Sequence, residues 1–87
     1  MKCIDFKPEG GKLVRMDYEI NNGILKTIAI TGDFFIYPEA AIKEIESILK
    51  GKPVKDIESI FKKYLKETKT TIIGFCAKDI GERLRGK

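Results

Sequence analysis

Apolar and polar residues alternate along positions 12–20, which is typical of a strand with one buried face. The inward residues would be Val14, Met16, Tyr18 and Ile20, and the outward residues Arg15, Asp17 and Glu19. Asn22-Gly23 follows, and an Asn-Gly pair readily supplies the positive φ angles of a tight hairpin turn. Residues 24–31 predict the returning strand, with inward residues Ile24, Ile28 and Ile30. Lys26 interrupts that row, and we expect its side chain to reach water at the sheet edge.

A third strand is predicted over residues 2–7, with Ile4 and Phe6 facing inward. Pro8 would end it, and Gly10-Gly11 would turn the chain back. The outer face of the sheet would carry a mixed set of residues, namely Arg15, Asp17, Glu19, Leu25, Thr27 and Ala29. Such a face is either solvated or covered by a partner.

The periodicity becomes helical after Gly32. From Pro38 onward the apolar residues Ala41, Ile42, Ile45, Ile48 and Leu49 have the spacing of an amphipathic helix, and Gly51 suits the position after its end. Pro53 opens a second helix that should end near Thr68. Its apolar stripe is Val54, Ile57, Ile60, Phe61, Tyr64 and Leu65.

Residues 72–75 predict an extended segment or a packed turn, followed by a short helix over residues 77–85. The inward residues of this helix would be Ala77, Ile80 and Leu84. Asp79 in its first turn and Arg83 in its last turn match the helix dipole. Gly81 weakens this helix by about 1 kcal/mol relative to Ala, so we expect the helix to depend on docking.

These elements predict a single α+β domain over residues 1–87, because strands precede helices and the length suits one core. We expect a two- or three-stranded antiparallel sheet, beginning with the hairpin, with three helices packed on one face. No apolar run approaches the roughly 20 residues of a membrane helix, and the first residues lack a signal-peptide pattern. We therefore expect a cytoplasmic protein that does not enter a membrane.

The chain offers few residues for chemistry. It has no His and only two cysteines, Cys3 and Cys76, without CxxC spacing, so we expect no metal site and no catalytic residue. Two reduced thiols are the simplest interpretation, although a disulfide between them stays open. The net charge of +4 comes from Lys residues that alternate with Glu, which is typical of a solvated surface. We expect no nucleic-acid binding, although a small nucleic-acid-binding module stays as an alternative that predicts strongly salt-dependent affinity.

The most informative motif lies at the strand-to-helix junction and reads Gly32-Asp33-Phe34-Phe35-Ile36-Tyr37-Pro38-Glu39. Consecutive side chains of an extended segment point to opposite sides, so Phe34 and Phe35 cannot both enter the core unless the chain bends at Gly32. An aromatic ring left outside would be an anchor for a protein interface. The candidate interface or structural motif is Gly32, Asp33, Phe34, Phe35 and Tyr37. Asp33 either accepts main-chain hydrogen bonds in the turn or pairs with a basic residue of a partner.

These residues resemble the C-terminal accessory domain of the lipoate–protein ligase A family, which is fused behind a catalytic domain or, in some archaea, forms a separate small chain. The resemblance extends over residues 11–84. It rests on the Gly32-Asp33-Phe34-Phe35 signature, the Pro38-Glu39 pair, Gly11-Lys12-Leu13-Val14-Arg15, the helix from Ile42 to Leu49 with Gly51, and Asp79-Ile80.

The resemblance implies a non-catalytic accessory subunit that forms a heterodimer with a catalytic ligase chain. The family's catalytic motifs, an Arg-Arg pair, a Gly-Gly-Gly-Ala loop and an essential Lys, have no counterpart in this sequence. ATP, Mg²⁺ and lipoate would be used by the complex, with no cofactor bound by this chain alone. A lipoyl domain or a glycine-cleavage H-type protein would receive the lipoate.

Such accessory domains also resemble sulfur-acceptor proteins in fold. A sulfur-carrier-like role of Cys76, placed near a helix N-terminus that can lower a thiol pKa, is therefore the remaining alternative.

Overall fold

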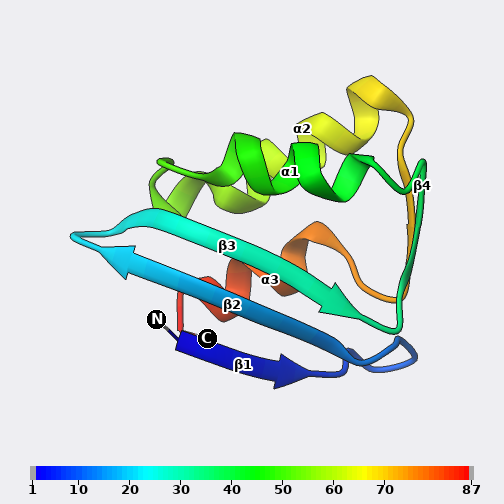
Figure 1. The fold of residues 1–87 in the computed structure, drawn as a ribbon, viewed down its shortest axis with the longest axis horizontal. Helices are drawn as coiled ribbons and strands as arrows, with labels where there is room; N and C mark the ends of the chain where they lie inside the picture. The colour runs from blue at the N-terminus through cyan, green and yellow to red at the C-terminus, as the bar shows by residue number, and fades with distance from the viewer. Residues whose placement is uncertain (1, 87) are drawn as a thin grey trace.

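The computed structural model describes residues 2–86, and its first part is an antiparallel sheet. Strands β1 (Lys2–Phe6), β2 (Val14–Asn21) and β3 (Ile24–Gly32) pair in the order β1-β2-β3 (Figure 1). Ile4 lies opposite Met16, and Phe6 lies opposite Val14, so both face inward as predicted. The hairpin, the third strand and the α+β class are confirmed.

The alternation of β3 is interrupted by an irregularity that the sequence analysis missed. Glu19 lies opposite Thr27 but Ile20 lies opposite Leu25, so Lys26 is an extra residue in the ladder. Leu25 is consequently fully buried, and its predicted place on the outer face was wrong. Lys26 is exposed because the bulge removes it from the inward row. Ile20, predicted inward, is exposed near the hairpin turn, which projects beyond the helices in Figure 1.

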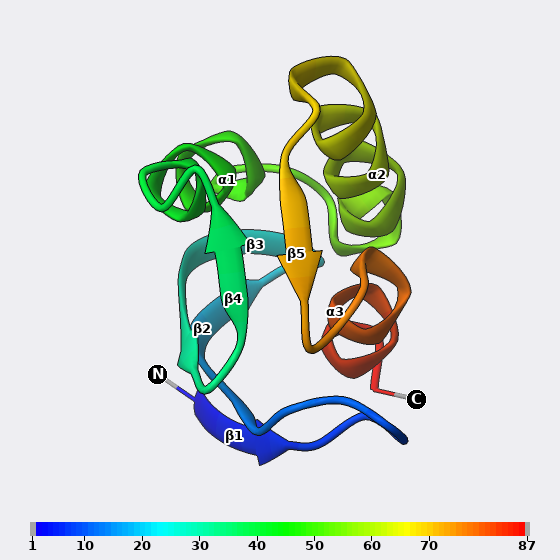
Figure 2. The same cartoon turned by 90° about the vertical axis from the view of Figure 1, so that its right-hand side faces the viewer.

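Three helices follow the sheet, as predicted. They are α1 (Ala41–Leu49), α2 (Ile57–Thr68) and α3 (Ala77–Leu84), with a short 3₁₀ turn, η1 (Val54–Asp56), before α2. The first helix begins three residues after Pro38, because Pro38 lies in a turn whose carbonyl accepts the N–H of Ala41 at 3.0 Å. Figure 2 shows the curved three-stranded sheet at the lower left, with α1 above it and α2 and α3 to its right.

The core lies between the sheet and these helices. Its fully buried side chains come from β2, β3 and the three helices, and are Val14, Met16, Leu25, Ile45, Leu49, Ile57, Phe61 and Ile80. All of them except Leu25 belong to the inward rows predicted from the sequence.

A second, two-stranded sheet closes one end of the molecule. Strand β4 (Phe35–Tyr37) pairs antiparallel with β5 (Thr71–Ile73), and the two run side by side at the front of Figure 2. An extended segment was predicted at the first place and either an extended segment or a packed turn at the second, but their pairing was not predicted. The two strands come from distant parts of the chain, so no local turn signal marks them as partners.

None of the helices in residues 2–86 combines the length and the apolar character needed to cross a bilayer.

Candidate protein interface

Phe34 and Phe35 lie on opposite sides of the chain, so the alternative in which both rings enter the core is wrong. The Phe34 ring meets the Phe75 ring edge-on, with 4.8 Å between centroids. Phe75 is buried and in turn meets the core ring of Phe61 at 6.1 Å. The Phe35 side chain is 71% exposed. Of the two, Phe34 therefore belongs to the core and Phe35 to the surface.

The β4–β5 pairing places Phe35 beside other exposed residues. Phe35 lies opposite Ile73, and Tyr37 lies opposite Thr71. Tyr37 is 77% exposed and Ile73 59% exposed. We call Phe35, Tyr37, Thr71 and Ile73 the ribbon face, which is the side of the two strands that points away from the core.

The opposite side of the ribbon is anchored to the core. Ile36 and Ile72 lie opposite one another between the residues of the ribbon face, and both pack against the core cluster. The alternation of a β-strand thus separates an inner apolar pair from an outer apolar group. The apolar residues of the outer group, Phe35, Tyr37 and Ile73, lie outside the core cluster and are exposed.

The ribbon face is hollowed. A depression of about 200 Å³ is lined by Phe35, Ile36, Tyr37, Glu39, Thr71 and Ile73. Glu39 contributes the one charged side chain among these lining residues. Its carboxylate takes part in no ion pair or hydrogen bond with the part of the chain from 2 to 86.

Gly32 and Asp33 shape the turn into β4. Gly32 has φ of +146°, a conformation that favours glycine, and a β-carbon there would collide with the carbonyl oxygen of Leu13. The Asp33 main-chain N–H donates to that same carbonyl at 2.9 Å. Its exposed carboxylate accepts no hydrogen bond within residues 2–86, so the first of the two alternatives for Asp33, a side-chain bond in the turn, is not formed.

Leu13, at the end of the β1–β2 loop, is a further exposed apolar residue whose main chain lies beside the turn into β4. Its side chain is 48% exposed, and its carbonyl is the acceptor for Asp33. The neighbouring Lys12 donates its main-chain N–H to the Gly74 carbonyl at 3.0 Å, next to the end of β5. Leu13 is thus held beside both chain segments that lead to the ribbon face.

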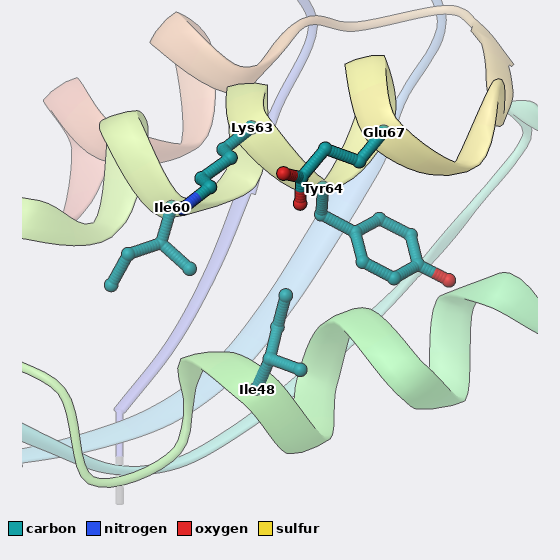
Figure 3. Close-up of a pocket in the computed structure, with 5 residues that line it drawn as sticks. All are labelled: Ile48, Ile60, Lys63, Tyr64 and Glu67. Atoms are coloured by element: carbon teal, nitrogen blue, oxygen red, sulfur yellow. The ribbon is translucent and has the colours of Figure 1, made fainter.

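A second hollow lies between α1 and α2. This groove of about 340 Å³ is lined by Ile48, Ile60, Lys63, Tyr64 and Glu67, and Figure 3 shows Ile48 on one helix facing Ile60 and Tyr64 on the other. The Tyr64 hydroxyl donates to Glu44 at 2.9 Å. Burial and this carboxylate raise the pKa of Tyr64 above its ordinary value. Ile48, Ile60 and Tyr64 belong to the apolar stripes predicted from the sequence, but the spacing of the two helices depends on tertiary packing and was not predicted.

Both cysteines are free thiols on the surface, so the disulfide left open above is absent. Cys76 precedes α3 as predicted, and its Sγ–H and its main-chain N–H both donate to the Asp79 carboxylate, at 3.3 and 2.9 Å. On β1, a hydrogen bond with Asp17 raises the pKa of Cys3. Residues 2–86 bring together no group of three His, Cys, Asp or Glu side chains able to hold a metal ion.

The C-terminal arginines contact their own fold. The Arg83 guanidinium lies 4.6 Å from the centre of the Phe6 ring, and Arg85 reaches the Glu58 carboxylate at 3.3 Å. The first contact is a cation–π interaction and the second an ion pair between α3 and α2.

Phe35 and Tyr37 were predicted as candidate interface residues, whereas Leu13, Thr71 and Ile73 were not. Glu39 was noted only as part of the junction motif. An Ile at the end of the short apolar run 72–73 was a weak signal, because both isoleucines were equally good candidates for the core.

Comparison with known proteins gives three related findings. The family model described as bacterial lipoate protein ligase C-terminus matches residues 7–83. Lipoate-protein ligase A subunit 2 of Thermoplasma acidophilum is 33% identical over 52 residues, which are 60% of this chain and 55% of that protein. The match thus spans about half the length of this curated relative.

A solved structure has a similar fold. It is described as an archaeal lipoylation system of Thermoplasma acidophilum, a bi-partite lipoate protein ligase and its E2 lipoyl domain. The alignment has a TM-score of 0.72 at 22% identity and covers 95% of this chain and 97% of that chain.

Proposed function

Because the chain belongs to the bacterial lipoate protein ligase C-terminus family, we propose that it is the non-catalytic accessory subunit of a two-chain lipoate–protein ligase. The observation that carries this proposal is the family match over residues 7–83, nearly the whole described chain. The exposed ribbon face supports it, because an accessory subunit needs an apolar surface for its partner.

The relatives support the two-chain form of the proposal. The Thermoplasma protein is named as subunit 2 of a ligase, and the similar solved structure is described as bi-partite. We therefore propose a cytoplasmic heterodimer of the archaeal split type, in which a separate catalytic chain holds ATP, Mg²⁺ and lipoate. A lipoyl domain or an H-type carrier protein would receive the lipoyl group from that chain.

The proposed step is the activation of lipoate. The lipoate carboxylate attacks the α-phosphate of ATP, which forms lipoyl-AMP and releases pyrophosphate. An accessory chain accelerates this step only if it binds the adenylation-competent conformation of its partner more tightly than the alternatives. Ordered binding loops then hold the two reactants in position for attack. A tenfold gain in rate corresponds to about 1.4 kcal/mol of such differential binding.

The test uses both purified chains. We expect this protein to co-elute with its cognate catalytic chain in size-exclusion chromatography. We also expect it to raise the rate of lipoate-dependent ATP–pyrophosphate exchange by about tenfold or more, which corresponds to the differential binding of about 1.4 kcal/mol given above. An equal concentration of serum albumin is the control for non-specific stabilisation. The proposal is wrong if this chain alone turns over lipoate and ATP, or if neither co-elution nor a rate gain is seen.

A further inference from the structure

We propose that the ribbon face, extended by Leu13, is the surface that binds the catalytic chain. The partner would place an apolar side chain in the hollow of the ribbon face and a Lys or Arg side chain opposite Glu39. This inference rests on the proposed function, but it can fail while that function stands.

The distribution of exposed apolar side chains supports this surface. Five large apolar side chains are exposed within residues 2–86, namely Leu13, Ile20, Phe35, Tyr37 and Ile73. Three belong to the ribbon face, and Leu13 is held beside it by its bond to Asp33. Isolated exposed apolar residues are ordinary, but a contiguous group that includes two aromatic rings is typical of an interface.

The ribbon of β4 and β5 is packed on one side only. It has two strands of three residues each, and only its inner side, Ile36 and Ile72, is packed. Two-stranded sheets are marginally stable in water unless another element covers them. A partner seated on the ribbon face would supply the missing cover, and the open hollow gives room for one of its apolar side chains.

The charge beside the hollow identifies the partner's chemistry. The chain has a net charge of +4, yet the charged residue of the hollow is Glu39. A carboxylate with no ion pair inside residues 2–86, placed beside an apolar hollow, favours a cation on the other side of the contact. A second copy of this chain fits less well, because a two-fold contact centred on the hollow would bring two Glu39 side chains together.

The groove between α1 and α2 is the competing surface. It is larger, but its rim carries both a cation, Lys63, and an anion, Glu67 (Figure 3). The hydroxyl of Tyr64, which lines this groove, already donates a hydrogen bond to the Glu44 carboxylate, so it does not need a partner chain as acceptor. None of the five most exposed large apolar side chains lies in this groove.

The main experiment measures the dissociation constant of the two-chain complex by isothermal titration calorimetry. We expect Phe35→Ala to raise the dissociation constant about tenfold or more, and the double variant with Tyr37→Ala about a hundredfold, as for interface anchors. Ile20→Ala is the matched control, because it removes an exposed apolar side chain far from the ribbon, and it should change the constant less than about twofold. Circular dichroism of each free variant verifies that it is folded.

The charge prediction has its own test. Binding of the wild-type chain should weaken as salt is added, and Glu39→Gln should reduce this salt dependence, while Glu39→Lys should weaken binding further. Glu67→Gln, on the competing groove, is the matched control and should leave the salt dependence unchanged.

The outcomes separate the two proposals. If the wild-type chains do not bind each other, the proposed function is wrong. If they bind and the Phe35 and Tyr37 variants bind equally well, only the surface is wrong. Loss of binding with Ile60→Ala and Lys63→Glu instead would place the partner in the α1–α2 groove. Self-association of the free chain that Phe35→Ala abolishes would identify a second copy as the occupant and overturn the inference.

Discussion

The carboxylate of Glu46 accepts a hydrogen bond from the main-chain N–H of Ile30 at 2.7 Å. Glu46 lies on α1, and Ile30 lies on β3, which is an edge strand of the three-stranded sheet. The N–H groups of an edge strand are open to water or to another chain unless something covers them. The Glu46 side chain therefore provides an acceptor for one N–H group of this edge strand and links α1 to the sheet.

We expect Glu46→Ala to lower the free energy of unfolding by about 1–3 kcal/mol, because a partly buried main-chain donor loses its charged acceptor. Urea denaturation measures the change. Glu46→Gln keeps an oxygen that can accept the hydrogen bond, so this variant should lose less free energy of unfolding than Glu46→Ala. Equal losses for the two variants would show that the hydrogen bond is not the cause.

Gly81 should resist replacement by Ala despite its position in a helix. Ala favours a helix by about 1 kcal/mol, but a β-carbon at position 81 would lie 2.8 Å from the β-carbon of Glu58 on α2. Because a β-carbon cannot move away without moving the helix, we expect Gly81→Ala to destabilise the fold by about 1–3 kcal/mol in total. A rise in the thermal unfolding midpoint would contradict this expectation and indicate that α2 and α3 separate easily.

Phe34 and Phe35 should differ in their effect on stability although they are neighbours. Phe34→Ala removes the ring that packs on Phe75, and we expect a loss of about 2 kcal/mol for this partly buried side chain. Phe35→Ala removes an exposed ring, and we expect the free energy of unfolding to change by less than about 0.5 kcal/mol. Chemical denaturation of both variants side by side gives the comparison. A large loss at Phe35 would mean that the ring supports the ribbon.

The acid sensitivity of the sheet should depend on Asp5 and Arg15. The Arg15 guanidinium donates to both Asp5 oxygens, at 2.7 and 3.2 Å, and this hydrogen bonding lowers the pKa of Asp5 below 3.8. A lowered pKa in the folded state favours the ionised carboxylate. The pair therefore adds stability above pH 3.8, and that contribution is lost as the pH falls through the lower folded pKa.

Carbon-13 NMR titration measures this pKa directly. We expect the Asp5 midpoint to lie below 3.8 in the wild type and to return toward 3.8 in Arg15→Gln. Asp5→Asn should also lose less thermal stability than the wild type between about pH 5 and about pH 2. An Asp5 midpoint that Arg15→Gln does not move would exclude the ion pair as the cause.

Replacement of Cys76 by Ser tests the sulfur-carrier alternative. Ser caps helices well, so Cys76→Ser should keep the α3 N-terminus intact and change the free energy of unfolding by no more than about 1 kcal/mol. We expect the variant to support pyrophosphate exchange by the catalytic chain as fully as the wild type. Loss of that support in a variant of normal stability would point to chemistry at the thiol.

The sequence predicted the fold where burial follows a simple period. Met16 and Tyr18 on a strand, and Ile45 and Leu49 on a helix, take the places that alternation and helical spacing assign to them. Leu25 departs from the period because one extra residue, Lys26, shifts the register. Bulges of this kind depend on the geometry of the whole ladder, so a row interrupted by a single Lys did not reveal one.

The candidate interface was predicted in part. Two adjacent aromatic residues required a choice between the core and the surface, and alternation showed that Phe34 and Phe35 would differ if the chain was extended. Which of the two rings is exposed depends on Phe75, because the Phe34 ring packs against the Phe75 ring and leaves Phe35 outside. Ile73 was missed for a related reason, because its neighbour across the ribbon is Phe35, far away in the sequence.

The pairing of Phe35 with Ile73 also determines when the ribbon face comes into existence during synthesis. A growing chain can complete it only after Ile73 has left the ribosome, when the three-stranded sheet, α1 and α2 have already been made. A partner that recognises this face would therefore meet a chain in which the three-stranded sheet and the first two helices have already been made. Binding at this face could not guide the folding steps that take place before Ile73 is made.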